Sequence, residues 1–406
     1  MDAHTGGRSR LTRRGLLAST AAAAAAAAGA LATQAASTGP AAAQATPPGS
    51  AVEPFHGPHQ AGIATVPQAH AVFAGLDLRD GVGREAVARM MRLLTDDARR
   101  LSAGGPALAD TEPELAVLPA RLTVTFGFGP GLFDAVGLAE ARPSSLKALP
   151  RFSIDRLQSR WNGGDVLVQI CADDPLTVAH ALRMIIKDAR AFTRVRWVQR
   201  GFRRAAGVQA SGLTQHNIMG QLDGTANAVP GTPVFDRVVW AGADAPAWLR
   251  GGTTLVLRRI RVELETWDAA DRVAKEFTVG RRLDTGAPLT GAAEHDPPDF
   301  AKLTPVGFPV ISEYAHIRRA HSADPAKGIF RRPYNYDEGL TAAGHSDSGL
   351  LFASYQADVG AQFLPMQRRL AEADLLNEWT TPIGSAVFAI PPGCGPGGWI
   401  GQSLLA

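Results

Sequence analysis

A glycine-bounded segment near the middle of the chain carries an aspartate that could face a ligand. The segment runs from His216 to Asn227 with the sequence HNIMGQLDGTAN. Gly220 and Gly224 would let the backbone turn tightly and approach a planar ligand, with Asp223 projecting from the turn. The pattern therefore predicts a binding turn, and an ordinary Asp-Gly turn is the alternative interpretation.

A second segment combines histidine with clustered guanidinium groups. Residues 313–321 read EYAHIRRAH, and residues 328–336 read GIFRRPYNY. Imidazole ligates metals and guanidinium pairs with carboxylates, so the mixture suits an anionic ligand that carries a metal. A basic surface loop is the alternative here.

Other patterns of catalysis and cofactor binding do not occur in the sequence. The ten histidines form no HExxH spacing, and the chain has no GxSxG, no GxxxxGK[ST] and no GxGxxG after a strand. Residues 126–131 (FGFGPG) have the wrong spacing for a phosphate loop and predict a strand end followed by a turn. We expect His180, His295 and His345 to be surface or satisfied polar residues.

The first 45 residues resemble a twin-arginine export signal. Arg13 and Arg14 precede a short apolar stretch that includes eight consecutive alanines over 21–28. Small residues follow, and we favour cleavage after Ala43-Gln44-Ala45, with Thr33-Gln34-Ala35 as the second choice. A basic, alanine-rich tail is the alternative. The signal predicts a soluble protein in the periplasm or outside the cell, and twin-arginine export, which carries folded proteins, favours a bound cofactor.

Composition and charge fit a folded enzyme-sized protein. The 406 residues are 45% hydrophobic and 19% charged, which excludes a disordered chain and predicts two or three domains. The formal excess of +3 belongs to the first 45 residues, so the remainder is neutral and gives no reason to expect nucleic acid as a partner. No later stretch approaches the ~20 apolar residues that span a membrane.

The two cysteines, Cys171 and Cys394, narrow the range of cofactors. They fit no CxxC, CxxCH or zinc spacing, which excludes covalent haem attachment and thiolate metal clusters. The sequence leaves open whether they form one disulfide or remain two buried thiols.

Short apolar strands followed by amphipathic helices recur along the chain. The expected strand and helix pairs are 71–78 with 84–100, 164–171 with 175–192, 254–264 with 268–279, and 350–355 with 362–373. Residues 122–126 look like an additional antiparallel strand.

Two such units in each half predict an α+β protein built from two ferredoxin-like domains with antiparallel sheets, by duplication. A doubly wound nucleotide-binding fold is the competing architecture, but its glycine motifs do not occur. After the signal peptide (1–45), we expect an irregular arm over 46–60, a first domain over 61–210 and a second domain over 211–406.

These segments together resemble the dye-decolourising peroxidase family, in particular its exported, deferrochelatase-like branch. Gly220, Asp223 and Gly224 match its GxxDG motif, and residues 315–318 (AHIR) match the segment with its haem-ligating histidine. Further matches lie at residues 54–63, at 280–282 with 286–289, at 330–336, and at 349–352 with 355–356. The resemblance therefore extends over nearly the whole chain after the signal.

Two positions depart from the family pattern. The family often has asparagine five residues after the ligand histidine, where this chain has His321. It often has glycine after the paired arginines, where this chain has Pro333. Both changes put the local loop geometry in question, and His321 could alter a haem edge or a propionate contact.

The resemblance implies one noncovalent haem b per chain, held mainly by the second domain. His316 would ligate the iron, Asp223 would move the peroxide proton, and Arg331 would stabilise charge as the O–O bond breaks. The turn residues Gly224, Thr225 and Ala226 and the segment His321, Ser322 and Ala323 would approach the haem. Arg281 would contact a propionate, and Arg318, Arg319 and Arg332 would add positive charge near the propionates.

The implied activity is reduction of hydrogen peroxide through a ferryl intermediate, with oxidation of dyes, phenols or other bulky organic reductants. We expect an acidic optimum, because a reference aspartate is about 2.5 pKa units more acidic than histidine. Tyr336, Tyr355 and Trp379 are the suggested radical relays to the surface, with core packing as the alternative for each.

Two other functions stay open: release of iron from haem, as a deferrochelatase, and a haem-binding carrier without turnover. Asp223 and Arg331 favour an enzyme, since a carrier needs only the ligand. The physiological reductant stays open as well, with a copper protein or an iron-uptake partner both compatible, and so does the oligomeric state.

Overall fold

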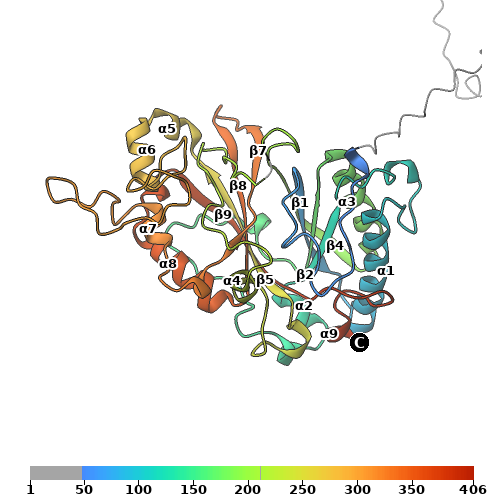
Figure 1. Cartoon of the computed structure of the whole chain (residues 1–406). Coiled ribbons are helices and arrows are strands. Elements are labelled where there is room, and N and C mark those ends of the chain that lie inside the picture. Colours follow the sequence, from blue (N-terminus) through green and yellow to red (C-terminus); the bar gives the residue numbers. More distant parts are fainter. Residues whose placement is uncertain (1–47, 211) are drawn as a thin grey trace, which may run out of the picture. The chain divides into compact units, whose positions relative to one another are not determined.

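The first half of the chain folds into an antiparallel sheet with helices on one face (Figure 1). The computed structural model describes residues 48–210 and 212–406, so the signal peptide prediction for 1–45 lies outside the described residues. The strands are β1 (His70–Leu78), β2 (Thr123–Phe128), β3 (Val166–Ala172) and β4 (Thr193–Phe202), and the covering helices are α1 (Arg84–Ser102) and α3 (Pro175–Ala189).

Alternation of side chains along β1 explains why this sheet has two apolar faces. Val72, Ala74 and Leu76 join the cluster formed with α1 and α3, whereas Ala71 and Phe73 join a second cluster on the other side. The helices have local signals of their own. The Asp174 carboxylate caps α3 by accepting from Thr177 N at 2.7 Å.

The second half repeats this plan. Its main strands are β5 (Thr253–Val262), β7 (Tyr334–Leu340), β8 (Ser346–Gln356) and β9 (Thr380–Ile390), with the two-residue strand β6 (Phe330–Arg331) beside β8. The helices that accompany it are α5 (Leu264–Ala269), α6 (Arg272–Val279), α7 (His316–Ala320) and α8 (Leu364–Ala373). Three further helices are α2 (Pro130–Ala135), α4 (Pro233–Val239) and α9 (Gln402–Leu405).

Both sheets have the same strand order. The first reads β4-β1-β3-β2 and the second β9-β5-β8-β7, so in each half the fourth strand lies beside the first, which lies beside the third. This is the order of the ferredoxin-like fold. The predicted α+β class with two ferredoxin-like parts is therefore confirmed, whereas the boundaries of 61–210 and 211–406 stay a prediction.

Single-residue bridges join the two sheets at two seams. Phe128 pairs with Ala389 at one seam, and Phe202 pairs with Asn335 at the other, so the strand pairings close into a ring. Inside the ring, Phe73 packs in one apolar cluster with Tyr355 of the opposite sheet. Each sheet is thus held internally by long ladders and joined to the other mainly by side chains.

The segment over 60–68, which precedes β1, reinforces both seams. Gln60 Nε2 donates to Phe126 O at 3.0 Å and to Pro391 O at 2.9 Å, and its Oε1 accepts from Phe126 N at 2.9 Å. At the other seam, the Arg332 guanidinium donates to Thr65 O and Gln68 Oε1. This segment therefore links both halves of the chain. In the described part of the arm expected over 46–60, the only regular element is a short helical turn at Pro48–Ser50.

Several local predictions needed correction. The helix expected over 268–279 is two helices, because Asp271 caps a new one by accepting from Ala274 N. The helix expected over 362–373 begins with a π-helical turn, Val359–Phe363.

The state of the two cysteines, which the sequence left open, is now defined: Cys171 and Cys394 are both free thiols. None of the helices in the described ranges is long and apolar enough to cross a membrane.

Candidate active site

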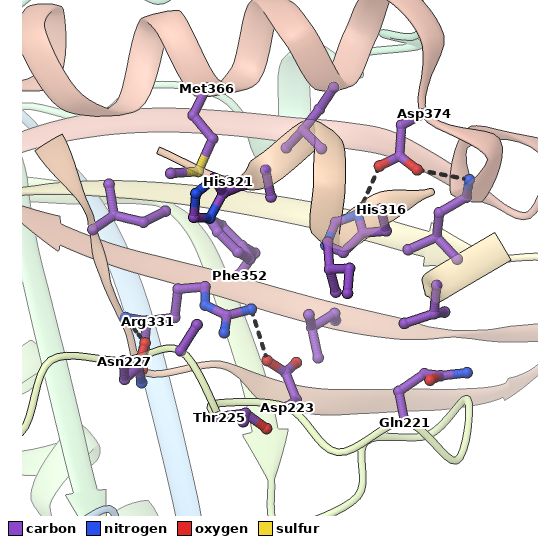
Figure 2. A pocket seen from close by; sticks show the side chains of 18 of the residues that line it. Gln221, Asp223, Thr225, Asn227, His316, His321, Arg331, Phe352, Met366 and Asp374 are labelled. Carbon is purple, nitrogen blue, oxygen red and sulfur yellow. Dashed lines mark hydrogen bonds and ion pairs between the residues drawn. The ribbon is translucent and has the colours of Figure 1, made fainter. Parts of the chain in front are cut away.

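A cavity of about 620 Å³ lies against the second sheet, on the face that the helices cover. Ile260 and Val262 of β5 and Phe352 of β8 form one wall, whereas Leu351 and Ala353, which flank Phe352, belong to the apolar cluster inside the ring. The loop over 217–228 and helices α7 and α8 complete the lining (Figure 2). Most of the lining is apolar, which suits a large planar ligand.

The cavity collects most of the residues that the sequence had suggested. Those that line it are Asp223, Thr225, Ala226, Arg281, His316, His321, Ser322 and Arg331. Gly224, Ala323, Tyr336, Tyr355 and Trp379 are not among its lining residues. Gly220 and Gly224 have φ values of 77° and 131°, which explains why the turn before and after Asp223 uses glycine.

His316, the first residue of α7, is held by a buried carboxylate. Its Nδ1 lies 2.6 Å from Oδ2 of Asp374, which follows α8 and has a side chain only 4% exposed. Burial lowers the pKa of His316, but the charge and hydrogen bond of Asp374 outweigh it, so the pKa is raised overall. The carboxylate fixes the proton on Nδ1, which leaves Nε2 as the nitrogen available to a ligand.

Asp223 and Arg331 face one another on the other side of the cavity (Figure 2). Arg331 Nη1 donates to Asp223 Oδ1 at 3.2 Å, and Asn217 Nδ2 donates to the second carboxylate oxygen at 3.4 Å. Their side chains are 10% and 23% exposed, respectively, so both are largely desolvated. A carboxylate, a guanidinium and an imidazole therefore converge on one space.

Asn227 connects the aspartate turn to the arginine strand. Its Nδ2 donates to Arg331 O at 2.7 Å, and its Oδ1 accepts from Arg331 N at 3.0 Å. Its own backbone N–H donates to Gly224 O at 2.8 Å.

Positive charge at the cavity comes from fewer arginines than predicted. Arg281 lines it, donating to the carbonyls of Gly286 and Glu294, and burial lowers its pKa. Arg258 also lines it and is paired with buried Asp155. Three other arginines were expected to add charge near the propionates, and they do not reach the cavity. Arg318, Arg319 and Arg332 direct their guanidinium groups to backbone carbonyls and other side chains, and none of them lines the cavity.

His321 lies at one end of the cavity near Met366 (Figure 2). Its ring meets Phe300 edge-on, with centroids 5.1 Å apart. His321 is exposed, so this histidine lines the edge of the cavity rather than packing in the core.

The three suggested relays have different surroundings. The guanidinium carbon of Arg259 lies 3.6 Å from the ring centroid of buried Tyr336. Buried Tyr355 donates to Gln169 Oε1. Trp379 is partly exposed and meets Trp267 edge-on at 5.2 Å.

Trp267 in turn connects to the cavity. Its Nε1 donates at 3.0 Å to the carbonyl of Met219, a lining residue. Of the three relays, Trp379 therefore has a contact path that runs from the cavity towards the surface.

Three contributing residues escaped the sequence reasoning. Asn217 and Asn227 stand within the aspartate segment, so their polar side chains at a turn were a visible signal. Asp374 lies 58 residues from His316 and had no local signal, although a carboxylate or carbonyl partner for the histidine was expected.

Comparisons with known proteins agree with this arrangement. The family model "Dyp-type peroxidase, N-terminal" matches residues 60–203, and "Dyp-type peroxidase, C-terminal" matches residues 214–395. A dye-decolorizing peroxidase of Thermobifida fusca is 40% identical over 359 residues, covering 85% of this chain and 83% of that protein. A deferrochelatase of Yersinia pestis is 37% identical over 371 residues, covering 87% and 85%.

Solved structures show the same likeness. A DyP-type peroxidase from Cellulomonas bogoriensis has 52% sequence identity and a TM-score of 0.86, covering 89% of this chain and 99% of that chain. Ferric DtpA from Streptomyces lividans has 41% identity and a TM-score of 0.85, covering 88% and 98%. Fold and site thus define a peroxidase, an oxidoreductase. The chain belongs to the Dyp-type peroxidase family.

Proposed function

We propose that this protein is a haem b peroxidase that reduces hydrogen peroxide and oxidises dyes, phenols or other bulky reductants. One observation carries the proposal: the pair His316–Asp374 and the pair Asp223–Arg331 line one apolar cavity from different sides. A peroxidase needs an iron ligand on one face of the haem and a proton carrier with a cation on the other.

The residues of the cavity fit a haem. The imidazole of His316 offers Nε2, the apolar walls suit a porphyrin, and Arg281 and Arg331 can pair with propionates. Binding would be noncovalent, with one haem per chain, because the sequence has no CxxCH. When bound, haem supplies the redox iron through which electrons pass from the reductant to peroxide.

The chain's own residues would manage protons and charge. Asp223 accepts the proton of one peroxide oxygen and returns it to the other, which leaves as water when the O–O bond breaks. Arg331 stabilises the negative charge that develops during this cleavage. Asp374 keeps the His316 ring in one orientation. Gly224 supports this by allowing the turn, and Thr225 is fixed by donating to Glu294 Oε1 at 2.8 Å.

Bulky reductants would be oxidised at the surface through Trp379. The edge-on pair Trp379–Trp267 and the Trp267–Met219 hydrogen bond support this route. Tyr336 is a poorer relay, because the cation of Arg259 over its ring opposes removal of an electron. Tyr355 is buried, so it would serve at most inside the ring.

Deferrochelatase activity is the second candidate, favoured by the similarity to the Yersinia protein. A carrier without turnover is less well supported, because it has no use for Asp223 and Arg331. We also propose export by the twin-arginine route to the periplasm or the exterior, which replacement of Arg13 and Arg14 by lysine tests. Undiminished secretion of that variant would refute the route.

The test of the function is spectroscopic. The mature protein should purify with a Soret band, and that band should change when hydrogen peroxide is added. A protein that binds no haem would refute the proposal as a whole. A Soret band that peroxide does not change would favour the carrier, and recovery of iron-free porphyrin with a reductant would favour the deferrochelatase.

A further inference from the structure

Both the nitrogen and the oxygen of the Asn227 side-chain amide form hydrogen bonds with the backbone of one residue, Arg331. Nδ2 donates to the carbonyl at 2.7 Å, and Oδ1 accepts from the N–H at 3.0 Å. We propose that Asn227 is a positioning residue that sets the alignment of Arg331 with Asp223. This two-bond contact is called the Asn227 clamp below.

The clamp forms the hydrogen bonds that a second neighbouring strand would otherwise form with β6. Strand β6, which carries Arg331, is only two residues long and pairs with β8 along one edge. Arg332 continues that edge by donating from its backbone N–H to Ala353 O at 2.9 Å. The N–H and C=O of Arg331 are satisfied on the other side by Asn227, so one carboxamide does what a neighbouring strand would do.

The same residue belongs to the turn that presents Asp223. The backbone N–H of Asn227 donates to Gly224 O at 2.8 Å, which closes the turn directly after the aspartate. Asn227 and Arg331 are 104 residues apart in the chain. The 3.2 Å contact of Asp223 with Arg331 is therefore set across a short bridge, not through the long intervening chain.

The chemistry of the clamp requires asparagine. Its side chain presents one donor and one acceptor, whereas an ionised aspartate presents acceptors only and would face the Arg331 carbonyl. Asn227 also lines the cavity, but both of its amide atoms already have partners in Arg331. It therefore acts through Arg331 and not by binding the substrate itself.

The inference rests on the proposed roles of Asp223 and Arg331, and its consequence is kinetic. If the clamp is lost, the guanidinium and carboxylate no longer share a fixed geometry, and small misplacements can cost up to ~100-fold in rate. We expect a loss of about tenfold or more in kcat/KM for peroxide, with haem binding retained.

Asn227→Ala and Asn227→Asp test the clamp in the haem-loaded full chain. Gln60→Ala is the matched control, because the Gln60 amide contacts Phe126 N and O in the same way at a seam away from the cavity. Amide hydrogen exchange of the peptide containing Arg331 should accelerate roughly tenfold in Asn227→Ala, as expected for the loss of one hydrogen bond. It should stay unchanged in Gln60→Ala.

Asn227→Asp adds a readout that a general loss of stability would not produce. At low pH the introduced carboxyl is protonated and can donate to Arg331 O as the amide does. The ratio of its kcat/KM to that of the wild type should therefore rise towards one as the pH falls, whereas the ratio for Asn227→Ala stays flat. If Asn227→Ala fails to fold, the pH dependence of the Asn227→Asp ratio still tests the clamp, and a ratio that stays flat would count against it.

Two results would overturn the clamp. One is unchanged exchange at Arg331 in Asn227→Ala, and the other is full activity of both Asn227 variants while Arg331→Leu is inactive. If instead Arg331→Leu and Asp223→Asn both turn over peroxide normally, the proposed catalytic roles of these two residues fail, and the exchange measurement still decides whether the clamp exists. A chain that binds no haem would refute the proposed function itself, which is a separate outcome.

Discussion

Arg331 donates directly to Asp223, Nη1 to Oδ1 at 3.2 Å, so the cation and the carboxylate on this side of the cavity form one hydrogen-bonded unit. Either group is the nearest counter-charge of the other. Replacing one of them therefore alters two things at once, and each substitution needs a readout that separates proton transfer from charge stabilisation.

Asp223→Asn should remove the proton carrier while keeping the size and the turn. We expect the rate of reaction with peroxide to fall by about 10²–10⁴, the usual contribution of a general acid–base residue. Stopped-flow spectroscopy of the haem band measures this, with exposed Asp80→Asn as the control. Normal rates in Asp223→Asn would transfer the role to Arg331.

Dye oxidation by the wild type should be fastest in acid, and rates rising towards neutral pH would contradict the assignment of Asp223 as the proton carrier.

Arg331→Leu should retain Asp223 but remove the stabilising charge. Loss of one preorganised electrostatic donor typically costs about 10²–10³ in rate, so we expect a fall in kcat of that order. Arg318→Leu is the comparison, since its guanidinium contacts Phe300 O and Ile311 O and does not line the cavity. Equal activity of the two variants would contradict the prediction.

Asp374→Asn should weaken haem retention without removing the histidine. The variant keeps the side-chain oxygen that accepts from Leu376 N at 2.9 Å but loses the carboxylate charge opposite His316. Substitution of a ligand's partner typically costs about 10–100-fold in affinity. The rate of haem transfer to apomyoglobin measures this loss, and an unchanged rate would show that Asp374 does not tune the ligand.

Trp379→Phe should lower oxidation of bulky dyes while the reaction with peroxide stays normal. Phenylalanine keeps most of the packing against Trp267 but is much harder to oxidise. Tyr336→Phe is the informative counterpart, because Arg259 lies over its ring and we expect no loss. The opposite outcome, with Tyr336→Phe impaired and Trp379→Phe normal, would reverse the proposed order of the relays.

Asp97→Asn should stabilise the protein above neutral pH. Burial, together with neighbouring Asp188, raises the pKa of Asp97 to about 7, although the hydrogen bond from Leu108 N opposes the shift. Between about pH 4 and 7 the folded protein thus keeps a proton that the unfolded chain releases, so wild-type stability falls across this window as pH rises.

The variant lacks this proton, so its advantage in Tm should be largest above pH 7 and vanish near pH 4. Calorimetry over this range, with Asp80→Asn as the exposed control, measures the difference. Parallel Tm curves for Asp97→Asn and the wild type would contradict the raised pKa.

The sequence was most informative where a short motif carries the chemistry. Asp223, His316 and Arg331 each stand in a compact local pattern, and the structure brings all three to one cavity. Strand β9 was missed because Pro382 and Gly384 interrupt its apolar pattern, and they lie where its pairing with β5 changes register. Strand β4 was missed because exposed arginines alternate with its buried residues.

The contacts that align the site residues join positions far apart in the chain, so local sequence patterns could not predict them. Asp374 meets His316 across 58 residues, and Asn227 meets Arg331 across 104. Such pairs depend on how the strands return to one sheet, a property of the assembled fold. The arginines show a further limit of local patterns, since Arg318 and Arg319 stand beside His316 in the sequence but donate to backbone carbonyls and do not line the cavity.

The two seams of the ring have far fewer backbone pairings than the sheets that they join. We therefore expect unfolding to be less cooperative across a seam than within a sheet. Within each sheet the ladders are long, but a seam has a single bridge supplemented by side chains such as Gln60 and Arg332. Substitution at one of these residues should open the ring locally while both sheets stay folded. Side-chain packing inside the ring, and not a continuous ladder, thus defines most of the interface between the halves, so substitutions can adjust that interface without changing the strand pairing of either sheet.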